Sequence, residues 1–305
     1  MENAPRSCRQ PRLLIHLPLL GVLTGLTGCH AGILDPQGPI TAAERLILVD
    51  ATVTMLAVVG PVIVLTLAFG WWFRAGNTRA HYRPTWSYSG RLEVVVWAIP
   101  ALIVMFLGGM AWVGTHRLDP PRDIASSVEP LDVDVISLDW KWLFIYPRQG
   151  IASINQLVVP AGTPIRMRLT SASVMNSFFV PQLAGQIYTM HGMTTRLNLV
   201  ANHAGTYQGL SSQFSGDGFS DMRFNVIAQS PADFNAWARM VRTTPQSLDA
   251  AAYQTLSRPS AKVRPIVFGN VLPGLFDEVS AGHSPAPVMP GEAQNVPHPS
   301  LRERH

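Results

Sequence analysis

The sequence predicts a membrane protein with two N-terminal transmembrane helices in an antiparallel hairpin, followed by an all-β sandwich or barrel with short C-terminal helices. Two long apolar segments, at 46–73 and 92–116, each exceed the roughly 20 residues that a helix needs to cross a bilayer. Farther along, short stretches alternate apolar and polar residues between glycine and proline turns, as strands do. The composition agrees, because 47 % of the residues are hydrophobic and only 14 % are charged.

The start of the chain has the pattern of a secretory signal. Several arginines precede the apolar run 13–26, which leads into LTGC, a sequence that resembles a lipobox ending at Cys29. We expect residues 1–28 to be removed as a lipoprotein signal peptide, Cys29 to be lipidated and residues 29–45 to form a periplasmic linker. Cleavage elsewhere, or an uncleaved anchor, is the alternative. Because processing would also remove Cys8, the mature chain would have no free thiol for a disulfide or a thiolate–metal site.

The two apolar segments are predicted to cross the membrane in opposite directions. The loop between them, 74–91, contains four arginines and no acidic residue, and loops of this composition stay in the cytoplasm. A lipidated Cys29 lies on the outer side, so the helix 46–73 runs inward and the helix 92–116 runs outward. Two buried core helices of a soluble protein fit poorly with segments so long and so poor in charge. We therefore expect a multi-pass protein of the bacterial inner membrane, with everything after about residue 117 in the periplasm.

The exterior part is predicted to be a β-sandwich at 117–229. In LDVDVISLDW, the residues Leu131, Val133 and Val135 share one face of a strand. The stretches PIRMRLT, RLNLVA and MRFNVIA repeat this alternation, and several short strands at such spacing are typical of a sandwich or barrel.

The region after the strands is predicted to be a C-terminal helical extension at 230–282. Ser230 has the character of an N-cap, with Pro231 at the first helical position. A second short helix is expected at 247–256. The proline-rich remainder, 283–305, has little apolar content and is predicted to be disordered.

The motifs of the chain follow the order of a known family. After the two apolar segments come DWKWLFIYP, then NSFFVPQLAGQIYTMHGMTTRLNL, then GTYQGLSSQFSGDGF. This order resembles subunit II of the haem–copper respiratory oxidases. The lipobox and the VMNSFFVP stretch bring it closest to subunit II of the cytochrome bo-type ubiquinol oxidases. The resemblance covers about residues 20–280 and implies that the sandwich is cupredoxin-like.

In the cytochrome c oxidases of that family, this domain holds a dinuclear copper centre bridged by two cysteine thiolates. By the resemblance, Ser211 and Ser215 occupy the bridging cysteine positions and Met222 matches the methionine ligand. Asn176 and Phe219 stand where the histidine ligands would be, and Gln213 stands where a backbone carbonyl binds the metal.

These six residues predict a vestigial site that binds no metal. Soft thiolates select and bridge copper, whereas a serine hydroxyl stays protonated and hard at neutral pH. Phe219 offers no lone pair, Asn176 offers only an amide oxygen, and one thioether cannot hold two metals. The loop would then close the sandwich and contact the catalytic subunit, although a simple surface turn is an alternative.

The resemblance implies that the chain is a non-redox subunit, with no catalytic residue, of a proton-pumping terminal oxidase that converts ubiquinol and oxygen to ubiquinone and water. Haems and copper would reside in the catalytic subunit I, and the further partners would be subunits III and IV and membrane lipid. The alternatives are subunit II of a menaquinol oxidase and a stand-alone metal-free cupredoxin lipoprotein that acts in assembly or binding. Nucleic-acid binding is not indicated, because the arginines are scattered along the chain.

Glu93, in RLEVVVWAIP, has two interpretations. An acid in the first turn of a helix is stabilised by the helix dipole and can stay hydrated at the interface. An acid at membrane depth is also a functional candidate. In the family, the glutamate at this position lies at the entrance of a proton-conducting channel of the catalytic subunit, so the resemblance makes Glu93 a candidate for a proton path.

Overall fold

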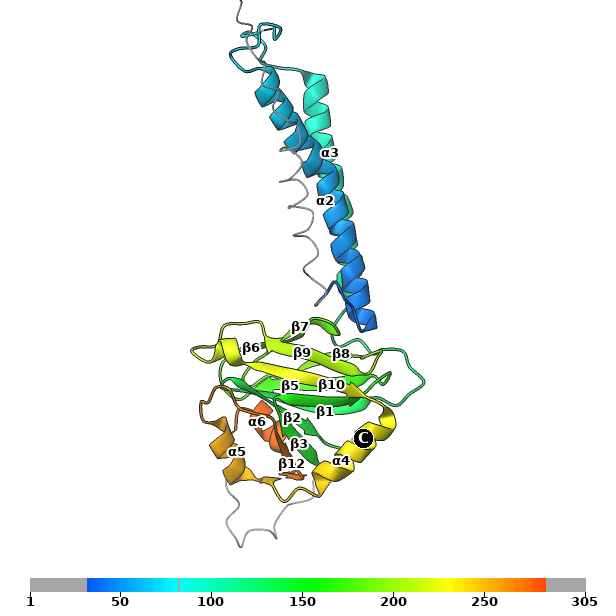
Figure 1. Ribbon diagram of the computed structural model, residues 1–305, viewed down its shortest axis with the longest axis vertical. Helices are drawn as coiled ribbons and strands as arrows, with labels where there is room; N and C mark the ends of the chain where they lie inside the picture. The colour runs from blue at the N-terminus through cyan, green and yellow to red at the C-terminus, as the bar shows by residue number, and fades with distance from the viewer. Residues whose placement is uncertain (1–31, 82, 284–305) are drawn as a thin grey trace, which may run out of the picture.

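The computed structural model describes residues 32–81 and 83–283 as a helical hairpin that stands on a β-sandwich (Figure 1). The hairpin consists of α2 (Pro39–Trp72) and α3 (Gly90–Arg117), both long and apolar enough to cross a membrane. The predicted signal peptide, Cys29 and residues 284–305 lie outside the described residues.

The first helix begins earlier than the sequence pattern indicated, because α2 starts at Pro39 inside the predicted linker 29–45. Its 34 residues span roughly 50 Å at 1.5 Å per residue, well over the roughly 30 Å of a hydrocarbon core. The first turn of α2 is therefore free to pack on the sandwich, and Thr41 there is fully buried. Pro39 suits this start, because proline at the first helical position gives up a hydrogen bond that the helix would not make.

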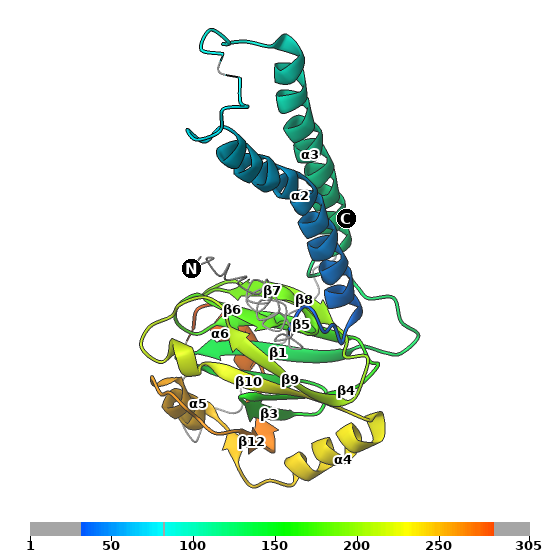
Figure 2. The same cartoon turned by 45° about the horizontal axis from the view of Figure 1, so that its top comes forward.

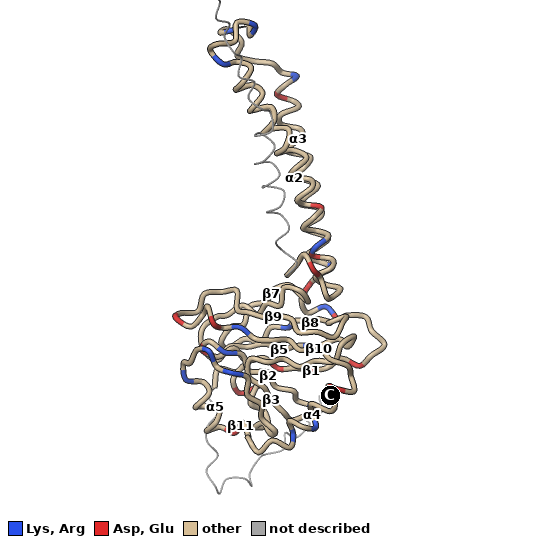
Figure 3. The backbone as a smooth tube through the Cα atoms, in the orientation of Figure 1, with Lys and Arg blue, Asp and Glu red and all other residues tan. Residues whose placement is uncertain are grey.

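The two helices approach each other at the sandwich end and diverge toward the loop that joins them (Figure 2). A Cβ atom on Gly114 would lie 2.8 Å from Ile47 Cδ1, so glycine permits the close approach of α3 to α2. Pro61 in α2 and Pro100 in α3 each remove one backbone hydrogen bond, which favours bending. Figure 3 shows basic residues gathered in the loop, whereas most of the hairpin carries no charge.

The sandwich contains two main sheets. The first has the strand order β12-β3-β2-β1-β5-β8, with β1 (Leu131–Leu138), β2 (Lys141–Tyr146), β3 (Ile151–Ile154), β5 (Ile165–Ser171), β8 (Thr195–Leu199) and β12 (Ile266–Phe268). The second has the order β4-β10-β9-β6-β7, with β4 (Gln156–Pro160), β6 (Asn176–Val180), β7 (Ala184–Thr189), β9 (Gly205–Ser211) and β10 (Arg223–Gln229). The four stretches predicted as strands are therefore confirmed as β1, β5, β8 and β10.

An aromatic cluster fills the space between the sheets. Trp142 and Phe144, both on β2, are fully buried and contact Phe178 of β6 and Phe224 of β10. The rings of Phe178 and Phe224 stack with centroids 5.0 Å apart. The aromatic residues of DWKWLFIYP thus bind the two sheets together, since large buried rings contribute much of the apolar area removed from water.

The C-terminal region is not wholly helical, so the prediction for 230–282 was wrong in part. It contains α4 (Pro231–Arg242), α5 (Ala250–Ser257) and α6 (Leu275–Ser280), but also β12 and the parallel pair of β11 (Ser247–Leu248) and β13 (Asn270–Val271). β12 pairs with β3 and so extends the first sheet. The expected helix at 247–256 begins at Ala250, where Asp249 Oδ1 accepts a 2.8 Å hydrogen bond from Ala252 N.

This extension covers the outer face of the first sheet and creates a second core. Ile136 and Leu138 of β1 are fully buried against residues of α5 and α6 (Figure 1). Lys141 is also fully buried, and its Nζ donates to the carbonyl oxygens of Asp139 and Arg258 and to Ser260 Oγ at 2.8–3.0 Å. Burial lowers the pKa of Lys141 from its usual value, with the charge of Asp139 opposing that shift. Three hydrogen bonds thus compensate a buried ammonium and fasten the chain after α5.

Candidate functional site

The six positions of the predicted vestigial site gather at one end of the second sheet, where β6 begins, β9 ends and β10 begins. Asn176 opens β6, Ser211 ends β9 and Met222 immediately precedes β10. Because β6 and β9 are neighbours, with Phe178 opposite Ser211, the first two side chains meet across the ladder. Gln213, Ser215 and Phe219 lie on the loop 212–221 that joins β9 to β10.

The polar side chains at the centre of this site bond to one another. Asn176 and Ser211 are 1 % and 3 % exposed, so each needs a partner inside the protein. Ser211 Oγ lies 3.2 Å from Asn176 Oδ1 and 3.3 Å from the carbonyl oxygen of Gln213, and its single proton serves one acceptor at a time. Asn176 Nδ2 donates to the Val174 carbonyl at 3.2 Å.

Met222 and Phe219 complete the site with apolar groups. Met222 is 1 % exposed, and Ser215 Oγ lies 4.0 Å from its sulfur, which is a weak contact. Phe219 begins a short 3-10 helix, Phe219–Asp221, and its ring meets the edge of Phe214 at 5.7 Å between centroids. Phe214 itself is 72 % exposed.

Trp140 holds the loop in place, a role that sequence reasoning missed. Its indole Nε1 donates to the Ser215 carbonyl at 3.0 Å. The loop lies so close to the indole that a Cβ atom on Gly218 would be 2.4 Å from Trp140 Cδ2. Gly216 has a φ of +106°, which side chains with a Cβ atom adopt rarely. The glycine pair flanking Asp217 is the signal in the sequence that could have indicated this close approach.

The limits of the loop are set by the two strands that flank it. β9 extends to Ser211, and β10 begins at Arg223. β11, β12 and β13 follow β10 in the chain. Ser211 is therefore a strand residue with a fixed backbone and not part of a mobile turn.

The donor set does not fit a dinuclear copper centre. The side chains are two hydroxyls, one amide and one thioether, together with an arene that has no lone pair, and none is a bridging thiolate. The close Ser211–Asn176 pair is internally satisfied and needs no ion to complete it. Within the described ranges 32–81 and 83–283, no group of three or more His, Cys, Asp or Glu residues is placed to hold a metal.

Glu93 lies far from these six positions. It occupies the first turn of α3, where its backbone N–H donates to the Ser89 carbonyl at 3.1 Å, and its side chain is exposed. The rest of α3 separates it from the sandwich by roughly 36 Å at 1.5 Å per residue. The structure therefore places the proton-path candidate at the loop end of the hairpin and the vestigial copper positions in the sandwich.

An ion pair between a buried aspartate and a partly exposed arginine on the outer face of the first sheet was not predicted from the sequence. Asp134 of β1 is 4 % exposed and accepts two hydrogen bonds from Arg168 of β5, at 2.7 and 2.8 Å. Burial raises the pKa of Asp134, while the hydrogen bonds and charge of Arg168 act against that rise. Arg168 also bonds to Asp277 at 3.0 Å and stacks on the ring of Phe276, so the pair fastens α6 to the sheet.

Family models match both parts of the exterior domain. Residues 133–229 match the model described as cytochrome c oxidase subunit II, periplasmic domain. Residues 242–281 match the model described as COX aromatic rich motif. The sandwich is thus similar to the periplasmic domain of cytochrome c oxidase subunit II, and the C-terminal extension to the COX aromatic rich motif.

Curated relatives match over most of their length. The chain is 48 % identical over 254 residues to cytochrome bo(3) ubiquinol oxidase subunit 2 of Pseudomonas aeruginosa, covering 83 % of this chain and 77 % of that protein. It is 47 % identical over 268 residues to the protein of the same name from Pseudomonas putida, covering 88 % and 85 %. It is 44 % identical over 284 residues to ubiquinol oxidase subunit 2 of Acetobacter aceti, covering 91 % and 92 %.

We expect the exterior domain, expressed as residues 119–283, to retain no stoichiometric copper after dialysis, as measured by elemental analysis. Replacing all four side chains together, Ser211→Cys, Ser215→Cys, Asn176→His and Phe219→His, should supply the missing thiolates and imidazoles and create a purple dinuclear centre.

The matched control for this experiment moves one cysteine by a single position, with Ser212→Cys in place of Ser211→Cys. Ser212 is exposed and bonds to Ser177 and Gln186 instead of facing the site, so this variant should stay colourless. Copper retained by the unmodified domain, or equal copper binding by both variants, would contradict this interpretation of the loop.

Proposed function

The chain belongs to the family of ubiquinol oxidase subunits 2, and we propose that it serves as subunit II of a proton-pumping terminal oxidase that oxidises ubiquinol and reduces oxygen to water. The observation that carries this proposal is identity of 41–48 % to five proteins named as ubiquinol oxidase subunit 2, across most of the chain. Relatives named only as quinol oxidase subunit 2, from Bacillus species, are 33–36 % identical. The higher identity to proteins named for ubiquinol favours ubiquinol as the electron donor.

Within that complex, we propose that this chain carries no redox centre. A quinol dissolved in the membrane can deliver electrons to a membrane-embedded subunit directly, so the exterior domain needs no copper to accept them. The donor set of the six vestigial positions supports this role. Haems and copper would then reside in the catalytic subunit I, with subunits III and IV completing the complex.

The loop 212–221 would serve as a docking element for the catalytic subunit. Phe214 exposes most of its ring, while Trp140 and two glycines fix the backbone on either side of Asp217. An exposed aromatic on a rigid loop is the kind of residue that anchors protein interfaces. On this proposal, the loop would keep its fold without a metal because it still forms a surface that contacts the catalytic subunit.

The complex isolated through a tag on this chain tests the proposed function. We expect haem to co-purify with the chain, and we expect oxygen consumption with ubiquinol to exceed that with menaquinol. A preparation without haem would favour the stand-alone lipoprotein, and faster turnover with menaquinol would identify a menaquinol oxidase subunit instead.

We also propose that the chain is anchored in the inner membrane by lipid at Cys29 as well as by α2 and α3. The intact mass of the mature protein should correspond to a chain that begins at Cys29 and carries acyl groups. Cys29→Ala should remain in the membrane fraction, because a spanning helix holds a protein far more strongly than acyl chains do. An unmodified cysteine, or wild-type protein that retains residues 1–28, would refute the lipidation.

Glu93 is proposed to contribute to the proton-entry path of the complex. Its exposed carboxylate at the loop end of α3 supports this role, since it can exchange protons with the cytoplasm if the loop faces inward. Glu93→Gln should lower turnover per haem several-fold while the haem content stays constant, and Glu93→Asp should recover part of the activity.

The matched control is Asp50→Asn, which neutralises an exposed acid of the same hairpin but in the half of α2 nearer the sandwich. If Glu93 only stabilises the helix, its replacement removes about 0.3–1 kcal/mol of dipole interaction and leaves turnover intact. Native turnover in a fully assembled Gln variant would therefore favour helix stabilisation over proton conduction.

A further inference from the structure

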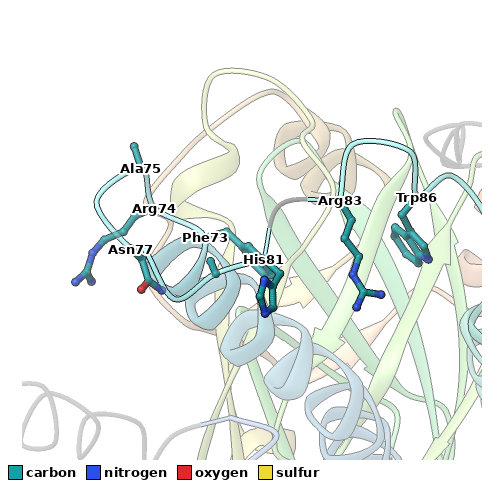
Figure 4. A pocket seen from close by; sticks show the side chains of 8 residues that line it. Phe73, Arg74, Ala75, Asn77, His81, Arg83 and Trp86 are labelled. Atoms are coloured by element: carbon teal, nitrogen blue, oxygen red, sulfur yellow. The ribbon is translucent and has the colours of Figure 1, made fainter.

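The loop that joins α2 to α3 encloses a cavity of about 650 Å³. The side chains that line it include Phe73, Arg74, Asn77, His81, Arg83 and Trp86. Figure 4 shows His81, Arg83 and Trp86 extending to the same side of the loop. Cavities of this size are in the range that proteins use for small ligands.

The charge of this loop is wholly positive. Residues 74–91 contain four arginines and no acid, and two of these arginines, Arg74 and Arg83, line the cavity. None of the ion pairs among the described residues involves any of the four. The cavity therefore offers two guanidinium groups whose charge the described part of the chain leaves uncompensated, which favours an anionic ligand.

Local hydrogen bonds fix the backbone that carries these arginines. Asn77 Nδ2 donates to the Trp72 carbonyl at 2.6 Å and so satisfies an acceptor at the end of α2. Asn77 N donates to the Arg74 carbonyl at 2.9 Å, and Trp86 N donates to the Arg83 carbonyl at 3.3 Å. Each cavity arginine thus begins a hydrogen-bonded turn and has a defined starting point for its side chain.

Aromatic side chains place the cavity at the level of the membrane surface. Trp71 and Trp72 end α2 and are 63 % and 46 % exposed, as expected for tryptophans at a lipid–water boundary. The guanidinium of Arg74 lies over the ring of Trp71, with Cζ 4.8 Å from the centroid. Trp86, 61 % exposed, adds an apolar surface to the cavity on the side of His81 and Arg83.

From this arrangement we propose that the loop cavity binds the phosphate headgroup of an anionic phospholipid of the inner leaflet, with Arg83 contacting the phosphate beside His81 and Trp86 and Arg74, which points to the other side (Figure 4), adding positive charge at the rim. Guanidinium groups bind phosphate oxygens in paired hydrogen bonds, and basic residues beside a membrane helix attract anionic lipid. A lipid fits better than free phosphate, because Phe73, which directly follows the apolar helix α2, lines the cavity, and acyl chains could lie along that helix. The proposal rests on the orientation given under the proposed function, in which the loop faces the cytoplasm.

The test compares two double variants of the complete complex that have the same net charge. Arg74→Gln with Arg83→Gln removes both cavity cations, whereas Arg79→Gln with Arg91→Gln removes two arginines of the same loop that do not line the cavity. Each complex is placed in phosphatidylcholine nanodiscs with increasing phosphatidylglycerol, and the lipid that stays bound after extraction is counted by native mass spectrometry.

We expect retention of phosphatidylglycerol to fall roughly tenfold or more in the cavity variant and less than about threefold in the control, given the attraction that each basic residue adds near a membrane. Equal losses in both variants would indicate diffuse surface attraction and overturn the site. Unchanged retention in the cavity variant would also overturn it, as would occupation of the cavity by a partner subunit. Displacement of the lipid by millimolar inorganic phosphate would identify a free anion as the ligand instead.

Two further measurements keep this test separate from the proposed function. Haem content and ubiquinol turnover of both variants report assembly, and the single change Arg83→Gln serves if the double variant fails to assemble. Thr78→Cys, an exposed position on the loop, reports orientation through labelling by an impermeant maleimide from the cytoplasmic side only. Labelling from the outer side would refute the orientation, whatever the lipid result.

Discussion

The packing of the start of α2 against the sandwich is the contact on which the placement of the hairpin relative to the sandwich depends. A Cβ atom on Gly38 would lie 2.5 Å from the Val200 carbonyl oxygen and 2.9 Å from that of Leu183, so only glycine fits at the start of this helix. Gln37 bonds to the backbone on both sides of this contact, donating to Gln182 and accepting from Asn202 at 2.8 Å. A single helix that begins against the sandwich, and that is long enough to cross a membrane, therefore connects the sandwich to the loop at the far end of the hairpin.

At the end of the second sheet where Asn176 and Ser211 lie, buried polar atoms bond to one another. A buried hydroxyl or amide without a partner costs about 1–3 kcal/mol, so Asn176 and Ser211 must be paired for this end of the sheet to stay closed to water. Their mutual contact, and the accepting carbonyl of Gln213, provide that pairing. The indole of Trp140 packs against this loop, and so close a contact requires glycine at position 218.

The sequence predicted the elements whose patterns are local and left out those that depend on distant partners. Alternation identified β1 and β5, and the N-cap of α4 was visible because Ser230 accepts from Asp233 N, three residues away. The motifs also identified the six vestigial positions, which the structure brings together from β6, β9 and the chain between β9 and β10. In contrast, β12 has three residues, too few for a periodic pattern, and it exists only because β3 offers an edge. Residues 39–45 were predicted to belong to a linker. In the structure they begin α2 and pack on the sandwich, a contact with distant residues that the local pattern does not show.

The sandwich is attached to the hairpin at a second place, and this second contact limits how the sandwich can rotate relative to the helices. After α3 ends, the chain is held to β8 by Asn198, whose backbone N–H donates to Pro120 and whose Nδ2 donates to the carbonyls of Pro121 and Arg122 at 2.9–3.1 Å. Asn198 is 5 % exposed, so these hydrogen bonds do not compete with water. One attachment alone would leave rotation about α2 free, whereas two attachments, one through each helix of the hairpin, fix the direction in which the sandwich faces. A loop on such a domain is already oriented before a partner binds, so docking loses less entropy than it would through a flexible linker.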